Sequence, residues 1–257
     1  MTAKLDNAKA LYLEGIEEGR AREAVERYTG DRYTQHSTGV RDGVEGFVEF
    51  FEPFIERNPR REIEVVRGWE DGRYVFLHAY QKLGGGAAEW VTTDFFDTDD
   101  ENRIVEHWDV IQASSGPNAS GHTQIDGATE ITDLDRTEEN KAIVRAMIED
   151  CLMTGGTAQR ITEFIAEEYV QHNPEVADGR DHFAALARKP DRELDYDEIV
   201  LCVGSGNFVA TLCRANRAGS PLCQVDIFRL DGGLIVEHWD NTEPVGPEDE
   251  WVNSGKF

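Results

Sequence analysis

The sequence predicts an α+β fold that is built twice within one chain of 257 residues. The first observation is a repeated string, IVEHWD, which ends at Asp109 and again at Asp240. The second is a shorter pair, YTQH and YVQH, which end at His36 and His172. A repeat of roughly 120 residues has the size of an ordinary domain and is far too long for a solenoid unit. We therefore expect each half to fold around its own core.

Helical patterns come before strand patterns in both halves. In the first half we expect a long helix that carries Ala8 to Ile16 and ends near Gly19, a shorter one over 21–29, and a third with its apolar face over 44–55, because apolar residues recur at helical spacing. Apolar runs after Pro59, separated by Gly- and Asp-rich turns, predict strands over 63–69, 74–80, 89–96 and 103–111. The second half repeats this order, with helices over 138–153, 158–166 and 180–187, and strands near 194–203, 207–216, 222–230 and 234–242.

Helices followed by consecutive strands indicate helices packed on one face of a curved, mainly antiparallel sheet of four or more strands. We place the first domain at 1–113, a linker at 114–132, the second domain at 133–243 and an extension at 244–257. The linker is rich in small polar residues that bury too little surface to fold alone. The extension has no counterpart in the first half, and its role is not readable from the sequence.

The charge balance disfavours several partners. The chain has 51 Asp and Glu against 26 Lys and Arg, a formal net charge of −25, so it repels nucleic acid and anionic membranes. An acidic, lysine-poor surface is typical of proteins in concentrated salt, where screening removes self-repulsion. We expect a protein of haloarchaeal type, with an acidic mesophilic protein as the alternative. No apolar run could span a bilayer and no signal-peptide pattern is present, which favours a cytoplasmic location.

Several common chemistries lack their sequence signatures. No GxGxxG, P-loop or GxSxG string occurs, so dinucleotide binding, NTP hydrolysis and esterase chemistry have no support. The cysteines have no CxxC spacing and are expected to be small buried hydrophobes rather than disulfides or zinc ligands. All four lie in the second half: Cys151, Cys202, Cys213 and Cys223.

The paired motifs resemble the SnoaL-like (polyketide cyclase-like) branch of the nuclear transport factor 2-like superfamily. In each half Tyr-x-Gln-His precedes a glycine and an apolar helix, and a strand with Asp-x-Phe, beginning at Asp94 or Asp226, precedes the IVEHWD string. The resemblance covers residues 4–113 and 136–243. It implies a cone-shaped domain with a pocket between sheet and helices. Such cones host cyclases, isomerases, hydrolases, dehydratases and plain binding modules, so the resemblance does not select a reaction.

Strand alternation predicts the side chains that share this pocket. His107 and Asp109 fall on one face of the last strand, as do His238 and Asp240 in the second half. If that face lines the cone, an aspartate in an apolar cavity has a raised pKa and can exchange a proton with a carbon acid. The nearby histidine can orient it or stabilise an enolate. The alternative is a structural hydrogen-bonded network that ties the last strand to the helices.

Other polar residues complete the candidate site. His36 and His172 are placed in the link between the second and third helices, with a pocket role and a structural role equally open. Asp94 and Asp226 are costly to bury without a partner, so each faces the cavity or meets a histidine. The candidate catalytic residues are Asp109, His107, His36, His78, Asp94, Asp240, His238, His172 and Asp226, and the candidate pocket-lining residues are Gln35, Trp90, Phe96 and Gln171.

The first half is expected to hold the better site, because His78 aligns with Leu212 and because its expected lining is more aromatic. The alternative is that Leu212 gives the second site a different specificity. His36, His78, His107 and Asp109 would satisfy a ligand count for zinc or iron, but they lack the short spacing of known metal motifs. We therefore expect no metal and no cofactor.

Two functions from different classes remain open. The first is a SnoaL-like enzyme that uses cofactor-free acid/base chemistry for an aldol-type cyclisation, isomerisation or hydration/dehydration, with Asp109 as the acid/base and histidines polarising a carbonyl. The second is a non-catalytic module that binds a small ligand or another protein. The expected ligand is small and apolar or carbonyl-containing. From the resemblance we also expect the two halves to form an intramolecular pseudo-dimer through their sheets, with higher oligomers left open.

Overall fold

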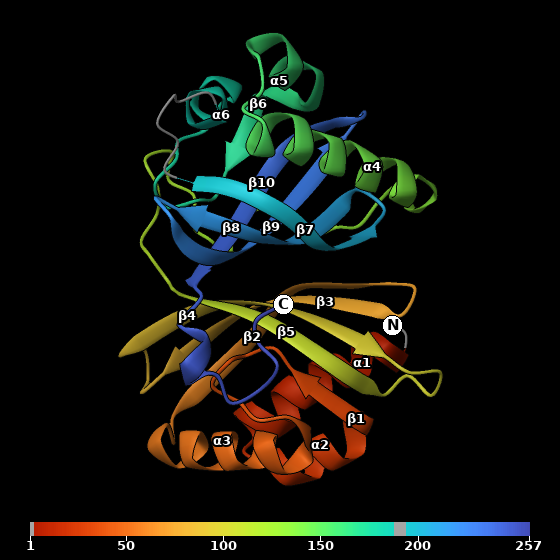
Figure 1. Cartoon of the computed structure of the whole chain (residues 1–257), viewed down its shortest axis with the longest axis vertical. Helices are drawn as coiled ribbons and strands as arrows, with labels where there is room; N and C mark the ends of the chain where they lie inside the picture. The colour runs from red at the N-terminus through yellow and green to blue at the C-terminus, as the bar shows by residue number, and fades with distance from the viewer. Residues whose placement is uncertain (1–2, 188–193) are drawn as a thin grey trace. The chain divides into compact units, whose positions relative to one another are not determined.

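The computed structural model describes residues 3–187 and 194–257 and divides into two compact units. The first unit comprises Met1–Ala113 together with Gly246–Phe257, and the second comprises Ser114–Val245. Each unit has helices packed on a five-stranded mixed sheet, so the predicted α+β class is confirmed (Figure 1).

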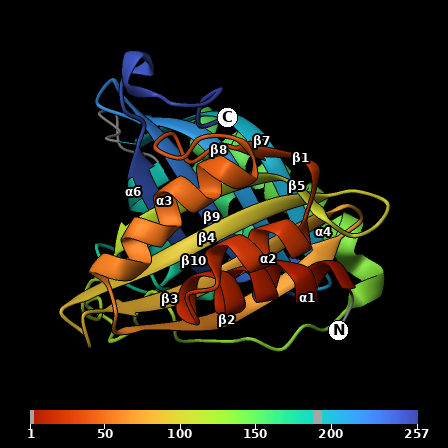
Figure 2. The same ribbon diagram turned by 90° about the horizontal axis from the view of Figure 1, so that it is seen from below.

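The first unit begins with its helices and ends with its sheet. The strand order is β1-β5-β4-β3-β2, antiparallel except for β1, which runs parallel to β5. Figure 2 shows α1, α2 and α3 lying over one face of this sheet. The elements are α1 (Ala3–Ala10), a π-helical continuation η1 (Leu11–Glu17), α2 (Ala21–Tyr28), β1 (Thr29–Gln35), α3 (Gly43–Arg57), β2 (Arg61–Asp71), β3 (Tyr74–Leu83), β4 (Ala88–Thr98) and β5 (Ile104–Ala113).

The second unit repeats this plan in its described residues. Its sheet order, β6-β10-β9-β8-β7, matches that of the first unit strand for strand, again with one parallel edge pair. The elements are η2 (Leu134–Arg136), α4 (Thr137–Met147), η3 (Ile148–Met153), α5 (Ala158–Phe164), β6 (Ile165–Gln171), α6 (Arg180–Ala187), β7 (Leu194–Ser205), β8 (Phe208–Arg217), β9 (Ser220–Asp231) and β10 (Leu234–Pro244), and a short 3-10 helix η4 (Glu248–Glu250) follows in the part of the chain that packs on the first unit.

The parallel edge strands β1 and β6 were not predicted. Their sequences, TGDRYTQ and IAEEYVQ, are too polar to show the pattern of a strand. His36 and His172 therefore follow directly on a strand instead of lying in a link between helices. Their backbone N–H groups donate to the carbonyls of His107 and His238, each at 2.9 Å, which continues the strand pairing by one residue.

The edge strand is joined to an aspartate just before the following helix in the same way in both units, before α3 in the first and before α6 in the second. The carboxylate of Asp42 accepts the backbone N–H of Gln35 at 2.8 Å, and Asp178 accepts that of Gln171 at 2.9 Å. These bonds satisfy backbone donors at the end of an edge strand, where the ladder supplies no partner. They also fix the position of the two glutamines.

The core of each unit lies between its helices and its sheet. In the first unit, Val25, Phe47 and Leu77 are all nearly inaccessible to solvent, and each such side chain contributes about 1.5–3 kcal/mol by leaving water. The four cysteines are free thiols, and Cys151, Cys213 and Cys223 are buried. None of the described helices has the length and apolar character needed to cross a membrane.

The segments expected to be a linker and an extension both pack on a unit. The side-chain amide of Asn118 donates to the carbonyls of Gln171 and Val176, at 2.6 and 3.0 Å, within the second unit. The side-chain amide of Asn253 donates to the carbonyls of Ser37 and Val40 within the first unit. The expected linker thus satisfies backbone carbonyls at and after the end of β6.

Candidate functional site

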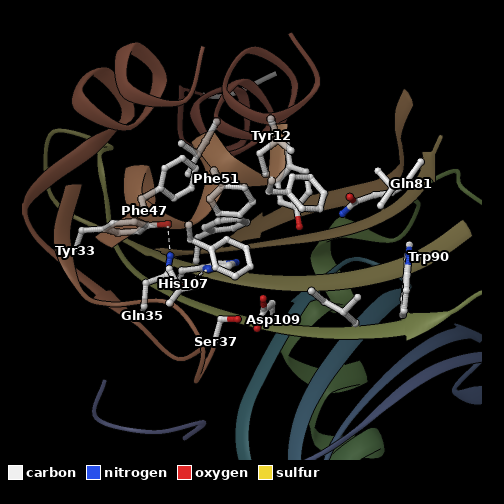
Figure 3. A pocket seen from close by; sticks show the side chains of 18 residues that line it. Tyr12, Tyr33, Gln35, Ser37, Phe47, Phe51, Gln81, Trp90, His107 and Asp109 are labelled. Atoms are coloured by element: carbon white, nitrogen blue, oxygen red, sulfur yellow. Dashed lines mark hydrogen bonds between the residues drawn. The ribbon is translucent and has the colours of Figure 1, made fainter. Parts of the chain in front are cut away.

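The first unit contains a cavity of about 180 Å³ between its helices and its sheet (Figure 3). Its wall is mainly aromatic and aliphatic, and a few polar groups converge on it, as is typical of small-molecule sites. The apolar lining includes Phe47, Phe50, Phe51, Phe54, Trp90 and Phe96, and the polar lining is Tyr12, Tyr33, Gln35, Ser37, Gln81, His107 and Asp109.

Strand β5 delivers two polar side chains to this cavity. His107 and Asp109 both line it, while the alternate residues Glu106 and Trp108 project from the opposite face. This is the alternation expected of a strand. His107 and Asp109 are 8% and 7% exposed, so both groups are buried polar residues that need partners.

His107 is the centre of a chain of hydrogen bonds. Its Nδ1 lies 2.9 Å from Gln35 Oε1 and its Nε2 lies 2.9 Å from Asp94 Oδ1. Because an amide oxygen can only accept, the Nδ1 atom carries a proton. Both ring nitrogens are thus engaged by the protein. His107 was expected to polarise a ligand carbonyl, but it has no nitrogen left for a ligand and acts on the cavity through its neighbours.

Asp94 lies behind His107 and is completely buried. Its Oδ1 also accepts the hydroxyl of Tyr12 at 2.8 Å, whereas its Oδ2 is buried without a hydrogen-bond partner among the described groups. Burial raises the pKa of Asp94, and the nearby His107 opposes this only in part. The carboxyl therefore meets a histidine and does not itself line the cavity.

Asp109 is held as a carboxylate by a cation that the sequence analysis missed. Lys256 Nζ lies 3.1 Å from Asp109 Oδ1, and both side chains are buried. Burial alone would raise the pKa of Asp109, but Lys256, His107 and the hydroxyl of Ser37 together bring it below the usual value. The expected raised pKa is therefore wrong for Asp109, because the argument from an apolar cavity omitted a buried lysine.

Tyr33 is a second polar group that was missed. Its hydroxyl oxygen accepts the side-chain amide of Gln35 at 2.9 Å, which leaves its own proton available to an acceptor in the cavity (Figure 3). Burial raises the pKa of Tyr33, so the hydroxyl keeps that proton. A signal for it was present, since Tyr33 and Tyr169 open the repeated Tyr-x-Gln-His motif.

His36 does not belong to the cavity. Its ring stacks on Trp108, with centroids 4.6 Å apart and an interplanar angle of 3°, on the other face of β5. Its Nε2 lies 2.9 Å from Glu106 Oε1, and its Nδ1 donates to the carbonyl of Gly255 at 2.7 Å. Of the two positions left open for this residue, the structure places it in hydrogen bonds outside the cavity.

His78 also lies away from the cavity. His78 pairs with Thr93 on β4, and Thr93 pairs with Val110 on β5. Because Val110 is next to Asp109 and points to the opposite face of the sheet, His78 also points away from the cavity. Its Nδ1 lies 3.1 Å from Arg67 Nη1. The metal set that combined His36, His78, His107 and Asp109 is consequently not assembled. The aligned Leu212 lies on the corresponding face of β8, so it does not give the second cavity a different lining.

The second unit has a cavity of about 280 Å³ with a similar polar core. His238 Nδ1 lies 3.0 Å from Gln171 Oε1, and its Nε2 lies 3.0 Å from Asp226 Oδ1. The hydroxyl of Tyr196 donates to Asp226 at 2.9 Å. His172 parallels His36, since it stacks on Trp239 and lies 3.0 Å from Glu237 Oε1. Gln171, Asp226, His238 and Asp240 line this cavity, whereas His172 does not.

The two cavities differ at the aspartate of β5 and β10. Asp240 is bonded to the amides of Asn173, at 2.7 Å, and Gln224, at 3.4 Å. Neither amide is charged. Burial therefore raises the pKa of Asp240, whereas the pKa of Asp109 is lowered. The second cavity also has a more polar rim, formed by Asn173, Glu175 and Arg217. The two sites therefore present different electrostatics to a ligand.

Two groups of side chains have the donor types for a metal ion. Asp226, His238 and Asp240 place ligand atoms within 4.8 Å of one another, as do His122, Asp126 and His172. In the first group, Asp226 already receives hydrogen bonds from Tyr196, Gln224 and His238, which fits a hydrogen-bonded network better than a cation.

Comparison with known proteins gives one family and a set of similar folds. The family model of the SnoaL-like domain matches residues 10–107 and again 144–238. No curated protein matches the chain. Solved structures with low sequence identity are similar to about half of this chain.

One of these is a protein from Bacillus cereus ATCC 10987 assigned as a polyketide cyclase, 16% identical, with 43% of this chain and 75% of that one covered and a TM-score of 0.39. Another, from Kribbella flavida DSM 17836, is assigned as a ketosteroid isomerase, with 16% identity, 44% and 83% coverage and a TM-score of 0.38. IdmH from Streptomyces antibioticus, assigned as a polyketide cyclase, has 19% identity, 41% and 92% coverage and a TM-score of 0.34.

Proposed function

Because the chain belongs to the SnoaL-like domain family through both of its halves, we propose that its cavities bind small, largely apolar ligands with a carbonyl group. In the first cavity this binding leads to a cofactor-free proton transfer. The observation that carries the proposal is a buried carboxylate, Asp109, in the same aromatic cavity as the hydroxyl donor Tyr33.

The chemistry follows from these two groups. Asp109 removes a proton from the carbon next to the carbonyl, and the electron pair of that C–H bond moves to the carbonyl oxygen. Tyr33 donates a hydrogen bond to the resulting enolate oxygen, where negative charge develops. The proton then returns from Asp109 to carbon. Aldol-type cyclisation, isomerisation and dehydration can all begin with this step, so the proposal does not distinguish among them.

The remaining groups support these two. The chain from Asp94 through His107 and Gln35 fixes the Tyr33 oxygen by three successive hydrogen bonds, each 2.9 Å long. Such preorganised donors avoid the cost of reorienting a solvent dipole during the reaction. The aromatic wall excludes water and strengthens every electrostatic interaction in the cavity.

One observation favours a non-catalytic binding module instead. A carboxylate that is ion-paired to Lys256 and has a lowered pKa is a weaker base than an isolated buried carboxylate. In that case the same cavity would hold its ligand without proton exchange.

Deuterium exchange separates the two functions. A panel of small cyclic ketones is incubated with the protein in D2O, and incorporation of deuterium next to the carbonyl is followed by mass spectrometry. We expect incorporation by the wild type and its loss in Asp109→Asn, while Asp240→Asn reports on the second cavity. Binding of a ketone without exchange would support the module, and equal losses in the two variants would refute a dominant first site.

The surface supports a further proposal about the environment. A net charge of −25 on this fold is suited to concentrated salt, where the screening length falls to roughly 3 Å at 1 M. We propose that the protein is salt-adapted, of haloarchaeal type.

A further inference from the structure

The segment Gly246–Phe257 packs on the first unit through a defined set of bonds. The backbone N–H of Val252 donates to the carbonyl of Thr38 at 3.0 Å, and Asn253 binds two carbonyls of the same loop. The side-chain oxygen of Asn253 in turn accepts the N–H of Gly255 at 2.9 Å. We call Gly246–Phe257 the tail segment.

We propose that the tail segment is a working part of the first cavity, in which Lys256 is the positioning residue for the Asp109 carboxylate and His36 is the anchor that places it there. The inference rests on the proposed function of Asp109 and adds the residues that set its charge. Lys256 lies 147 residues after Asp109 in the sequence.

His36 connects the two faces of β5. Its Nε2 is fixed by Glu106 and its ring by Trp108, so its Nδ1 has one direction in which to donate, toward the carbonyl of Gly255. The next residue is Lys256, whose Nζ reaches Asp109. His107 therefore acts on the Asp109 carboxylate from within the cavity, whereas Glu106 and Trp108 act on it through His36 and the tail segment.

Gly255 is required for this placement. Its φ is +107°, and a Cβ built on it would lie 2.3 Å from Cζ3 of Trp251, closer than any real contact. A side chain at this position is therefore excluded by both backbone conformation and space. Gly255→Ala should displace Lys256 without altering a residue that lines the cavity.

The second unit shows the same anchor without the cation. There the carbonyl of Thr123 lies 2.8 Å from His172 Nδ1, as the carbonyl of Gly255 lies 2.7 Å from His36 Nδ1, although His172 Nδ1 also lies 2.7 Å from Asp126 Oδ1. The residue after Thr123 is Gln124, where the first unit has Lys256. The residue after the anchored carbonyl is thus neutral in the second unit and carries an ammonium group in the first. Gln124 Oε1 accepts the backbone N–H of Ser115, and Asp240 is bonded by Asn173 and Gln224.

The charges that face Asp109 show why this difference matters. A buried carboxylate is stabilised by an opposite charge within ~4–6 Å and destabilised by a like charge. Lys256 and His107 stabilise the Asp109 carboxylate, and Asp94 destabilises it. The groups that face Asp109 from each element are Lys256 on the tail segment, His107 on β5, Asp94 on β4, Tyr12 on η1, and Tyr33 and Ser37 at and after β1.

The test is the pKa of Asp109 itself, measured in the full chain by carbon-13 NMR of labelled aspartate carboxyls, with Asp109→Asn to assign the signal. Lys256→Gln introduces the side chain that the second unit carries at Gln124. It should raise the pKa of Asp109 by about one pH unit or more. Lys256→Arg keeps the cation and should stay near the wild type. Lys4→Gln is the matched control, since Lys4 is only partly buried and its ammonium group donates to the carbonyl of Gly72 in the turn between β2 and β3.

Gly255→Ala is a second, independent variant for the same pKa measurement. It should raise the pKa of Asp109 in the same direction as Lys256→Gln, even though the lysine is still present. If Lys256→Gln does not fold, this variant and Lys256→Arg carry the test. An unchanged pKa of Asp109 in folded Lys256→Gln or in Gly255→Ala would overturn the proposal.

The deuterium-exchange assay keeps this inference separate from the proposed function. If the pKa of Asp109 rises in both variants and the pH dependence of exchange moves with it, both proposals stand. If the pKa rises but no protein exchanges any ketone, the tail segment is confirmed as the support of Asp109 and the proposed reaction is wrong. If exchange is lost in Asp109→Asn while the pKa is insensitive to Lys256, only the role of the tail segment fails.

Discussion

His107 Nε2 lies 2.9 Å from Asp94 Oδ1, and the same pair recurs in the second unit as His238 and Asp226 at 3.0 Å. In both units the other ring nitrogen faces a glutamine that is fixed by the edge strand. The repeated element is therefore the buried network behind the cavity. The groups that would touch a ligand differ between the units.

Tyr33→Phe tests the hydroxyl donor in the first cavity. The ring and its packing remain, but the enolate oxygen loses its hydrogen bond, so the rate of deuterium exchange should fall by roughly 10²-fold or more. Ligand affinity should change little, because the interaction strengthens only as charge develops. The matched control is Tyr169→Phe, the corresponding residue of the second unit. Equal effects of the two substitutions, or none from Tyr33→Phe, would remove Tyr33 from the mechanism.

Tyr12→Phe tests the support of Asp94. The Tyr12 hydroxyl donates to Asp94 Oδ1 at 2.8 Å inside the core, and Asp94 Oδ2 is already without a partner. Removal of the Tyr12 hydroxyl should lower the free energy of unfolding by about 1–3 kcal/mol, measured by urea denaturation. Tyr74→Phe, on the same sheet and only half-buried, is the control. A loss no larger than that of Tyr74→Phe would contradict the proposed importance of the bond.

Glu237 predicts a pH dependence of stability. Burial opposes its ionisation, but hydrogen bonds from His172 and Arg229 hold the pKa of Glu237 at about 2, against an ordinary value of 4.5. The folded state therefore gains stability that is fully present above pH 4.5 and is lost as the pH falls toward 2. The gain is on the order of 3 kcal/mol. The difference in unfolding free energy between wild type and Glu237→Gln should shrink over this range, whereas a difference that does not depend on pH would exclude ionisation as its cause.

The net charge of −25 predicts a response to salt. Because screening reduces repulsion among surface carboxylates, the melting temperature should rise between dilute buffer and molar KCl. The measurement is a series of thermal melts at increasing KCl, with matched concentrations of sucrose as an uncharged control. A melting temperature that stays flat or falls with KCl would count against the salt-adapted proposal.

The fold and part of the site followed from local sequence patterns. Period-two alternation placed His107 and Asp109 together, because neighbours on one face of a strand are fixed by the backbone alone. It did not place His78, since the face that β3 presents to the cavity depends on its register with β4, which local pattern does not contain. The edge strand β1 was missed because TGDRYTQ is mostly polar, and its strand conformation comes from pairing with β5.

The charge of Asp109 could not be derived from the sequence. Its partner Lys256 lies in a segment with no apolar pattern and no counterpart motif, and their contact joins positions 109 and 256. Burial in an apolar cavity would by itself raise the pKa of both aspartates. The pKa of Asp240, whose hydrogen-bond partners are neutral amides, is raised, whereas that of Asp109 is lowered by Lys256. Long-range contacts between charges decide this property, and they appear only in the folded chain.

A crystal structure of the protein with a bound cyclic ketone is the most direct test of the first cavity as a proton-transfer site. The predicted result has the carbonyl oxygen about 3 Å from the Tyr33 hydroxyl and the adjacent carbon facing the Asp109 carboxylate. A ketone bound with its carbonyl away from Tyr33, or found only outside this cavity, would contradict the proposed reaction.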